Sequence, residues 1–132
     1  MTLRFMLDTD TVSFALRGQG QVAAKLLERR PSELCVSAIT VAELRYGAFR
    51  RSSSRLHALI DTFISDVSVM PFDERCATQY GLIASELAHR GAPIGELDVL
   101  IAAHAFALGV ALVTNNVKHF SRVRGLKVEN WV

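Results

Sequence analysis

The stretch DVLIAAHAFALGVALVT, residues 98–114, decides the fold of this chain. Its first part places apolar side chains at helical spacing, and Gly109 follows where a helix C-cap favours glycine. Residues 110–114 form an apolar run that ends at Thr114, which is typical of a strand covered on both faces of a parallel sheet. The whole stretch is too short to span a bilayer. We therefore predict a buried helix followed by a strand at the centre of a parallel sheet.

Strands and helices alternate outward from this stretch along the rest of the chain. Further strands are predicted at residues 3–7, 34–37, 67–70 and 126–129. Stretches with the helical period fill most of the intervals, and Thr9 or Asp10 is predicted to cap the first of these helices. The alternation predicts an α/β fold in which residues 1–132 form one domain, with a central parallel sheet of four to five strands flanked by helices.

The composition adds a hint of a partner. Half of the 132 residues are hydrophobic, which is rich for a small monomer and predicts apolar surface buried against another protein. The net charge of +2 is too small to indicate nucleic-acid binding by itself, but basic residues gather in two clusters. The clusters are Arg45, Arg50, Arg51 and Arg55, and Lys118, Arg122, Arg124 and Lys127. Both clusters are interpreted as solvated faces, and the cluster from Arg45 to Arg55 has contact with flanking phosphates as its alternative.

Cys35 and Cys76 show no metal-ligand spacing and no need for a disulfide, so we interpret both as small buried hydrophobes. No signal peptide is predicted, because the first apolar run is short and Asp8 interrupts it. These features predict a cytoplasmic location with no membrane association.

Three acidic residues carry the functional prediction: Asp8, Glu43 and Asp98. Each lies where a predicted strand hands over to a helix, or in the first turns of a helix. In a parallel sheet such positions meet at one edge, where α/β proteins bind ligands. Carboxylates gathered there repel one another unless a cation lies among them. Because Mg²⁺ and Mn²⁺ prefer oxygen ligands, the three acids predict a Mg²⁺ or Mn²⁺ site and phosphodiester chemistry.

Each acid also has a structural interpretation. Asp10 fits a helix cap better than a metal ligand. Thr40 and Glu43 match the T-x-x-E capping box, and Asp98 suits the positive end of a helix. His104 falls on an apolar helical face and is interpreted as a hydrogen-bonded core histidine.

Two other functions compete with a metal-dependent nuclease. Asp8-Thr9-Asp10-Thr11-Val12 resembles the D-x-D-x-T signature of haloacid-dehalogenase-type phosphatases, in which the first aspartate is the nucleophile. Against this, the strand ending at Thr114 is followed by Asn115-Asn116 rather than by an acidic pair. The second alternative is a non-catalytic RNA-binding regulatory domain with a structural cation.

Four blocks in order resemble the PIN domain family, most closely the VapC toxins of bacterial toxin–antitoxin modules. The blocks are Leu7-Asp8-Thr9-Asp10, then SAITVAELRYG at residues 37–47, then DVLIAAHA at residues 98–105, then Leu112-Val113-Thr114-Asn115-Asn116 with Phe120. The resemblance extends over essentially the whole chain, to Trp131.

The resemblance implies a Mg²⁺- or Mn²⁺-dependent endoribonuclease with tRNA as a family-level substrate. It also implies a cognate antitoxin and a homodimer or a larger toxin–antitoxin assembly. Asp8, Glu43 and Asp98 match the family's acids. The family often carries a further acid at the position of Asn116 or His119, and this chain has neither. Asn116 is therefore expected to position water or ligand. The site is expected to bind either one or two metal ions.

Overall fold

A five-stranded parallel sheet forms the centre of the computed structural model, which describes residues 2–132. Its strands are β1 (Phe5–Leu7), β2 (Leu34–Ser37), β3 (Ser68–Met70), β4 (Ala111–Val113) and β5 (Val128–Glu129), in the order β3-β2-β1-β4-β5. All four neighbouring pairs are parallel. The predicted α/β class and a sheet of four to five strands are confirmed.

The centre of the sheet is β1, whereas the sequence predicted the strand of residues 110–114 there. Leu7 pairs with Val36 of β2 on one side and with Val113 of β4 on the other. The short strand β5 lies beyond β4 as the edge. An apolar run shows only that both faces of a strand are covered, so it does not locate the strand in the order.

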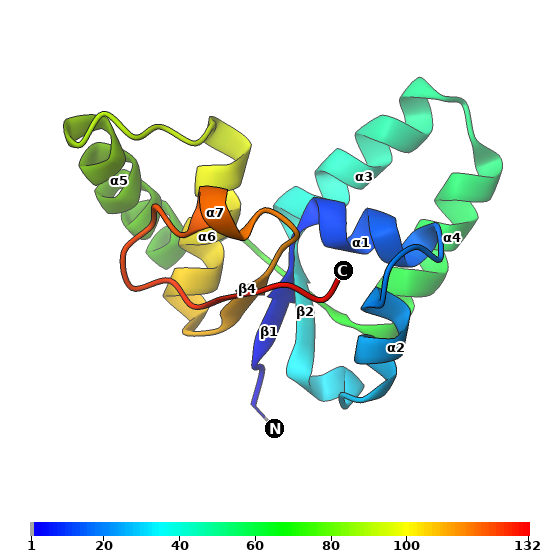
Figure 1. Cartoon of the computed structure of the whole chain (residues 1–132). Coiled ribbons are helices and arrows are strands. Elements are labelled where there is room, and N and C mark those ends of the chain that lie inside the picture. The colour runs from blue at the N-terminus through cyan, green and yellow to red at the C-terminus, as the bar shows by residue number, and fades with distance from the viewer. Residues whose placement is uncertain (1) are drawn as a thin grey trace.

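Helices cover both faces of the sheet (Figure 1). They are α1 (Thr9–Leu16), α2 (Val22–Leu27), α3 (Ala38–Arg50), α4 (Ser54–Asp66), α5 (Glu74–His89), α6 (Glu96–Leu108) and α7 (Val117–Phe120), with a 3-10 turn η1 (Pro31–Glu33). The first four helices lie on one side and α5 to α7 on the other. The carboxyl ends of the strands point to the upper edge in this view, where α1, α3 and α7 begin.

The pleat of the strands divides the core in two. Met6 and Leu112 pack in the cluster beneath α5 and α6, while Phe5, Leu7 and Val113 pack in the cluster beneath α1 to α4. Successive side chains of a strand point to opposite faces, so the same strands contribute side chains to both cores.

Helix α6 is buried more completely than one helical face would require. All residues from Ile101 to Ala105 are buried, because α6 lies between the sheet and α5, with which it makes its most extensive contacts. Leu97, by contrast, is exposed at the start of the helix. Both cysteines are buried and free, and burial raises the pKa of Cys35 to about 12. In the described residues 2–132, no helix combines the length and the apolar character needed to cross a membrane.

Candidate active site

Asp8 lies at the point where β1 ends and α1 begins. Its carboxylate is the N-cap of α1, and Oδ1 accepts the backbone N–H of Thr11 at 2.8 Å. The prediction that Thr9 or Asp10 caps this helix is therefore wrong, because both residues lie inside its first turn. Burial raises the pKa of Asp8, and hydrogen bonds from Thr114 and Thr11 oppose that rise. The side chain is thus oriented by its neighbours while its charge is poorly solvated.

Glu43 projects from the second turn of α3. This helix is capped by Ser37, whose Oγ accepts the backbone N–H of Ile39 at 3.0 Å. Thr40 therefore lies inside the helix, so the capping-box interpretation of Glu43 is wrong. The hydroxyl of Thr9 donates to Oε1 of Glu43 at 2.7 Å. This hydrogen bond ties the acid of α3 to the residue after Asp8.

Asp98 lies in the first turn of α6 and is paired with a residue from α7. Nε2 of His119 is 3.0 Å from Oδ2 of Asp98 and 2.8 Å from the carbonyl oxygen of Ile94. A carbonyl oxygen only accepts, so Nε2 carries a proton that it shares between the two oxygens. Burial raises the pKa of Asp98, and His119 opposes that rise.

The electrostatics place the three predicted acids in one site. Repulsion from Asp98, Asp10 and Asp8 adds to burial in raising the pKa of Glu43. Asp10 also raises the pKa of Asp8 and of Asp98, although burial is the larger cause for each. Across residues 2–132, no basic side chain forms an ion pair with Asp8, Asp10 or Glu43. The site therefore holds an excess of negative charge that its own side chains leave largely unbalanced.

A buried contact holds the helices of Glu43 and Asp98 together. Nδ1 of His104 on α6 is hydrogen-bonded to Oγ of Ser37, the N-cap of α3, at 2.8 Å. His104 is 0% exposed, and burial lowers its pKa. The predicted hydrogen-bonded core histidine is confirmed, and its contact fixes the start of α3 against α6.

Asn116 is placed less decisively than the acids. It is exposed, and its backbone N–H donates to Oγ1 of Thr114 at 3.0 Å. In the described part of the chain, no hydrogen bond joins its side chain to Asp8, Glu43 or Asp98. Asn116 is linked to Asp8 only indirectly, because its backbone bonds to Thr114 and Thr114 bonds to Asp8. Its predicted role therefore stays a prediction.

The donor set suits a divalent cation that keeps much of its hydration. Within residues 2–132, no three histidine, cysteine, aspartate or glutamate side chains converge into a ready-made metal cage. Mg²⁺ does not need one, because it commonly binds through one or two carboxylates, several waters and a substrate phosphate. Carboxylates that repel one another, one of them in contact with His119, match that requirement.

Sequence reasoning underrated three members of this site. Thr9 and Asp10 follow Asp8 directly, but the hydrogen bond from Thr9 to Glu43 and the repulsion between Asp10 and Asp98 arise only because the sheet brings α3 and α6 to this edge. In the sequence, His119 stands out only as a position where the family often has an acid. Its position shortly after β4 was the available signal, because that strand ends at the same edge of the sheet.

The comparison with known proteins agrees with this arrangement. The PIN domain model matches residues 5–126. The tRNA(fMet)-specific endonuclease VapC of Salmonella typhimurium is 38% identical over 98% of each chain. Ribonuclease VapC2 of Haemophilus influenzae is 39% identical over 98% of this chain and 99% of its own. The fold and site define a PIN-type domain, and the chain belongs to the PIN domain family. Within that family it is similar to VapC ribonucleases.

Solved structures show the same likeness in three dimensions. The DNA-bound VapBC structure from Salmonella typhimurium superposes with a TM-score of 0.93 at 37% identity, covering 99% of this chain and 100% of the other. VapBC2 from Rickettsia felis, bound to a DNA fragment from its promoter, gives 0.92 at 32% identity, covering 98% of this chain and 100% of the other. Neither the phosphatase nor the non-catalytic alternative gains support, since these named relatives are ribonucleases or their complexes.

Proposed function

We propose that this chain is a Mg²⁺- or Mn²⁺-dependent endoribonuclease and the toxin component of a type II toxin–antitoxin pair. One observation carries the catalytic part. Asp8, Glu43 and Asp98 come from three distant segments, and burial raises the pKa of each; repulsion from Asp8 and Asp98 adds to the rise at Glu43, and repulsion from Asp10 adds to all three. A cluster of this kind favours a hard cation and, through it, a phosphate.

Asp8 and Asp98 are proposed as the ligands that hold the ion, because each is fixed by a neighbouring donor. Thr11 orients Asp8, and His119 orients Asp98. A bound Mg²⁺ or Mn²⁺ would supply an activated water and would neutralise charge that builds on the phosphate.

Glu43 is proposed to contact the ion through water or to orient the attacking water. The hydroxyl of Thr9 engages Oε1 of Glu43 and so fixes the direction of the carboxylate. Asn116 remains a proposed contact to water or ligand, supported by its position just after Thr114.

The substrate is proposed to be RNA, with tRNA as the first class to test. Support comes from the Salmonella typhimurium relative, which is named for cleavage of tRNA(fMet). That likeness extends over 98% of each chain, and the described fold places both core clusters on one sheet, which supports a single nuclease domain.

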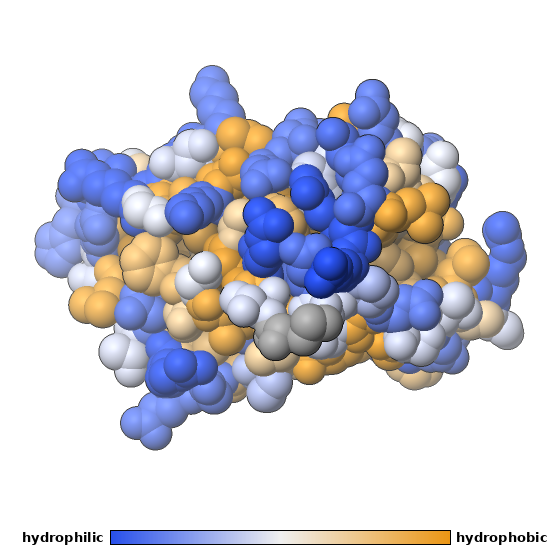
Figure 2. Space-filling model, turned by 90° about the horizontal axis from the view of Figure 1, so that it is seen from below, coloured by the Kyte–Doolittle hydropathy of each residue, from blue (hydrophilic) through white to orange (hydrophobic). Residues whose placement is uncertain are grey.

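The partner is proposed to be an antitoxin that buries apolar surface of this domain. A cavity of about 590 Å³ opens between α2, η1 and α4, with Leu26, Phe63 and Val67 among its walls. Leu27 also lines this cavity and is 88% exposed. Seen from below, apolar surface shows on the side of the molecule where α2 and α4 lie (Figure 2). The solved VapBC relatives support a protein partner. A homodimer of this chain is also proposed, and light scattering of the partner-free protein tests it.

The test is cleavage of an initiator tRNA transcript by the purified, partner-free protein under single-turnover conditions. We expect cutting with Mn²⁺ or Mg²⁺, none with EDTA, and a loss of rate in Asp8→Asn and Asp98→Asn. Removing one electrostatic group of this kind costs about 3 kcal/mol of transition-state stabilisation, or roughly a hundredfold in rate.

Asp66→Asn is the matched control for cleavage alone, because Asp66 is an exposed aspartate at the end of α4 that lines the cavity proposed for the partner and not the candidate active site. Cleavage by Asp8→Asn and Asp98→Asn at the control rate would refute the site. Co-expression with the product of a neighbouring reading frame, followed by size exclusion, tests the partner: a complex without nuclease activity is expected.

A further inference from the structure

The structure separates the first basic cluster into engaged and free arginines. Arg45 pairs with Asp61, and its guanidinium lies 2.9 Å from Nδ1 of His57. Arg50 donates to the hydroxyl of Tyr46 at 3.2 Å. Arg51 is exposed and, across residues 2–132, forms no ion pair.

The second basic cluster is partly engaged as well. Arg122 donates to the carbonyl oxygen of Pro93 at 3.1 Å, and Arg124 lies 3.6 Å from Glu86. These two guanidiniums hold the segment after α7 against α5 and its following loop, so they are committed to structure.

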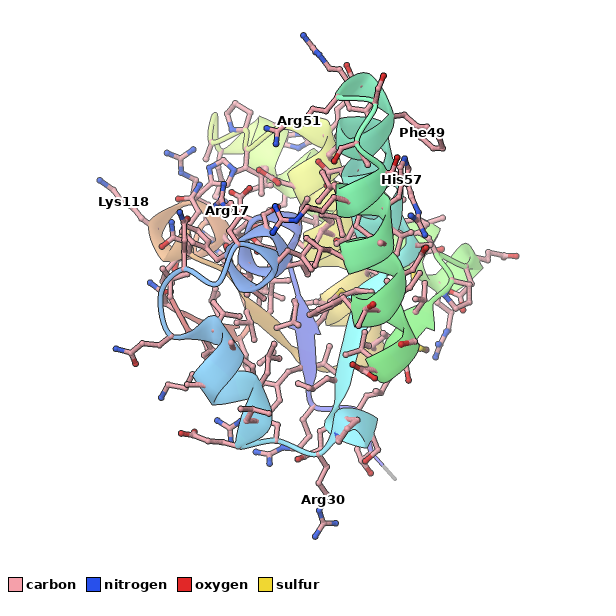
Figure 3. All side chains as sticks on the ribbon, turned by 90° about the vertical axis from the view of Figure 1, so that its right-hand side faces the viewer. Arg17, Arg30, Phe49, Arg51, His57 and Lys118 are labelled. Carbon is pink, nitrogen blue, oxygen red and sulfur yellow. The ribbon has the colours of Figure 1, made fainter. Side chains whose placement is uncertain are left out.

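Three free arginines from different elements share one cavity. Arg17 follows α1, Arg51 follows α3, and Arg55 lies in the first turn of α4. All three line a cavity of about 400 Å³, together with Leu56 and Leu59. Figure 3 shows Arg17 and Arg51 on the upper part of this face and Arg30 at its opposite, lower end.

The arginine cavity continues into the candidate active site. A second cavity of about 180 Å³ shares Leu16, Arg17, Arg51 and Leu56 with the first. Its other walls include Thr9 and Glu43. The two cavities adjoin at these shared walls, so together they form a trough lined by Glu43 and by the three arginines.

The charges of this trough are unbalanced at both ends. None of the three arginines has an acidic partner among the described residues, and their like charges repel one another. The capping positions of Arg17 and Arg51 suit the negative ends of their helices, but Arg55 adds its charge to the positive end of α4. Arg17 also stacks on Phe14, with its central carbon 5.1 Å from the ring centre, which steadies the guanidinium and leaves its N–H groups free.

We propose that Arg17, Arg51 and Arg55 form a subsite for a backbone phosphate of the RNA next to the one that is cut. The inference rests on the proposed nuclease function. An RNA backbone with one phosphate at the acids must continue out of the site along an open surface. The trough provides such a surface. Guanidinium binds phosphate through paired N–H donors, which suits arginine better than lysine here.

The subsite contributes to substrate binding rather than to the bond-breaking step. Interactions with a remote phosphate are equal in the ground state and the transition state, so their loss raises KM and leaves kcat nearly unchanged. Each lost phosphate contact also lowers the salt dependence of binding, by about 0.7 in the slope of log K against log salt for single strands.

The experiment compares Arg17→Ala, Arg51→Ala and Arg55→Ala with Arg30→Ala as the matched control. Arg30 is an exposed arginine at the far end of the molecule. Cleavage of an initiator tRNA transcript is measured with Mn²⁺ at several salt concentrations. Each subsite variant should raise KM roughly fivefold, as expected for the loss of one exposed charged contact. Arg51→Lys should keep the salt slope of the wild type.

A second measurement separates this inference from the nuclease function. Binding of the same transcript is followed by fluorescence anisotropy in EDTA. The arginine substitutions are introduced into the Asp98→Asn variant, so that the RNA is not cut during the measurement. The three arginine substitutions should weaken binding and flatten the salt slope even if the protein proves not to cut RNA. Arginine variants that match Arg30→Ala in both KM and slope would overturn the subsite. So would variants that bind RNA normally but lose the partner complex, since that outcome assigns the arginines to an acidic protein segment.

Discussion

Nε2 of His119 lies 3.0 Å from Oδ2 of Asp98, and the same proton reaches the carbonyl oxygen of Ile94 at 2.8 Å. The carbonyl fixes which nitrogen carries the hydrogen, and the shared contact fixes the direction of the imidazole. His119 thereby orients a carboxylate of the site from a helix that follows β4. Where the family often has a further acid, this chain has a hydrogen-bond donor.

His119→Ala is expected to weaken Mn²⁺ binding by about tenfold, because loss of a residue that orients a metal ligand typically has that effect. His119→Gln should lose less, since its amide N–H is also a donor. Calorimetric titration with Mn²⁺ measures both variants, alongside cleavage. Equal Mn²⁺ affinity in the alanine variant and the wild type would show that Asp98 needs no such support.

Asp8→Asn is expected to raise thermal stability at pH 7 in EDTA. Asparagine caps a helix as well as aspartate, and it removes a buried charge. Burial raises the folded-state pKa of Asp8 above its value in the unfolded chain. The free energy of unfolding therefore falls as the pH rises from the unfolded-state pKa through the folded-state pKa. The gain from Asn should therefore shrink as the pH falls and Asp8 becomes protonated. Melts at pH 4 and pH 7 decide this; a variant less stable at pH 7 would contradict it.

His104 predicts a pH dependence of the opposite sign. Burial lowers its folded-state pKa, whereas the unfolded histidine titrates near pH 6.5. Below that value the unfolded chain takes up the proton more readily, so the free energy of unfolding falls as the pH drops. His104→Gln should be less stable at neutral pH and should lose part of this fall between pH 7 and pH 5. His89→Gln, an exposed histidine on α5, is the control and should keep the wild-type slope.

Asn116→Asp tests whether Asn116 belongs to the site. A new carboxylate beside Asp8, Glu43 and Asp98 should increase affinity for Mn²⁺ and lower the Tm in EDTA, because like charges repel. Adding Mn²⁺ should then restore more stability than in the wild type. Asn115→Asp, a change of the exposed neighbour, serves as the control. If the two variants behave alike, the segment after β4 contributes packing rather than ligands.

Local patterns were enough to predict much of the fold. Leu34–Ser37 was predicted residue for residue. Asp73 caps α5, with its side chain accepting the N–H of Cys76, and aspartate is a residue that favours this position. Caps and apolar periods act over a few residues, so the sequence displays them directly. Thr9 was misassigned as a possible cap because Asp8 stands immediately before it and satisfies the same N–H group.

The grouping of Asp8, Glu43 and Asp98 also followed from the sequence, because a parallel sheet with helical crossovers brings the carboxyl ends of its strands to one edge. What only the tertiary structure decided is which side chains are engaged and which are free. Arg45 is occupied by Asp61, while Arg51, a few residues further along, faces the trough beside Glu43. Such pairings join residues far apart in the chain, and their geometry depends on how whole helices pack, which no local pattern of residues specifies.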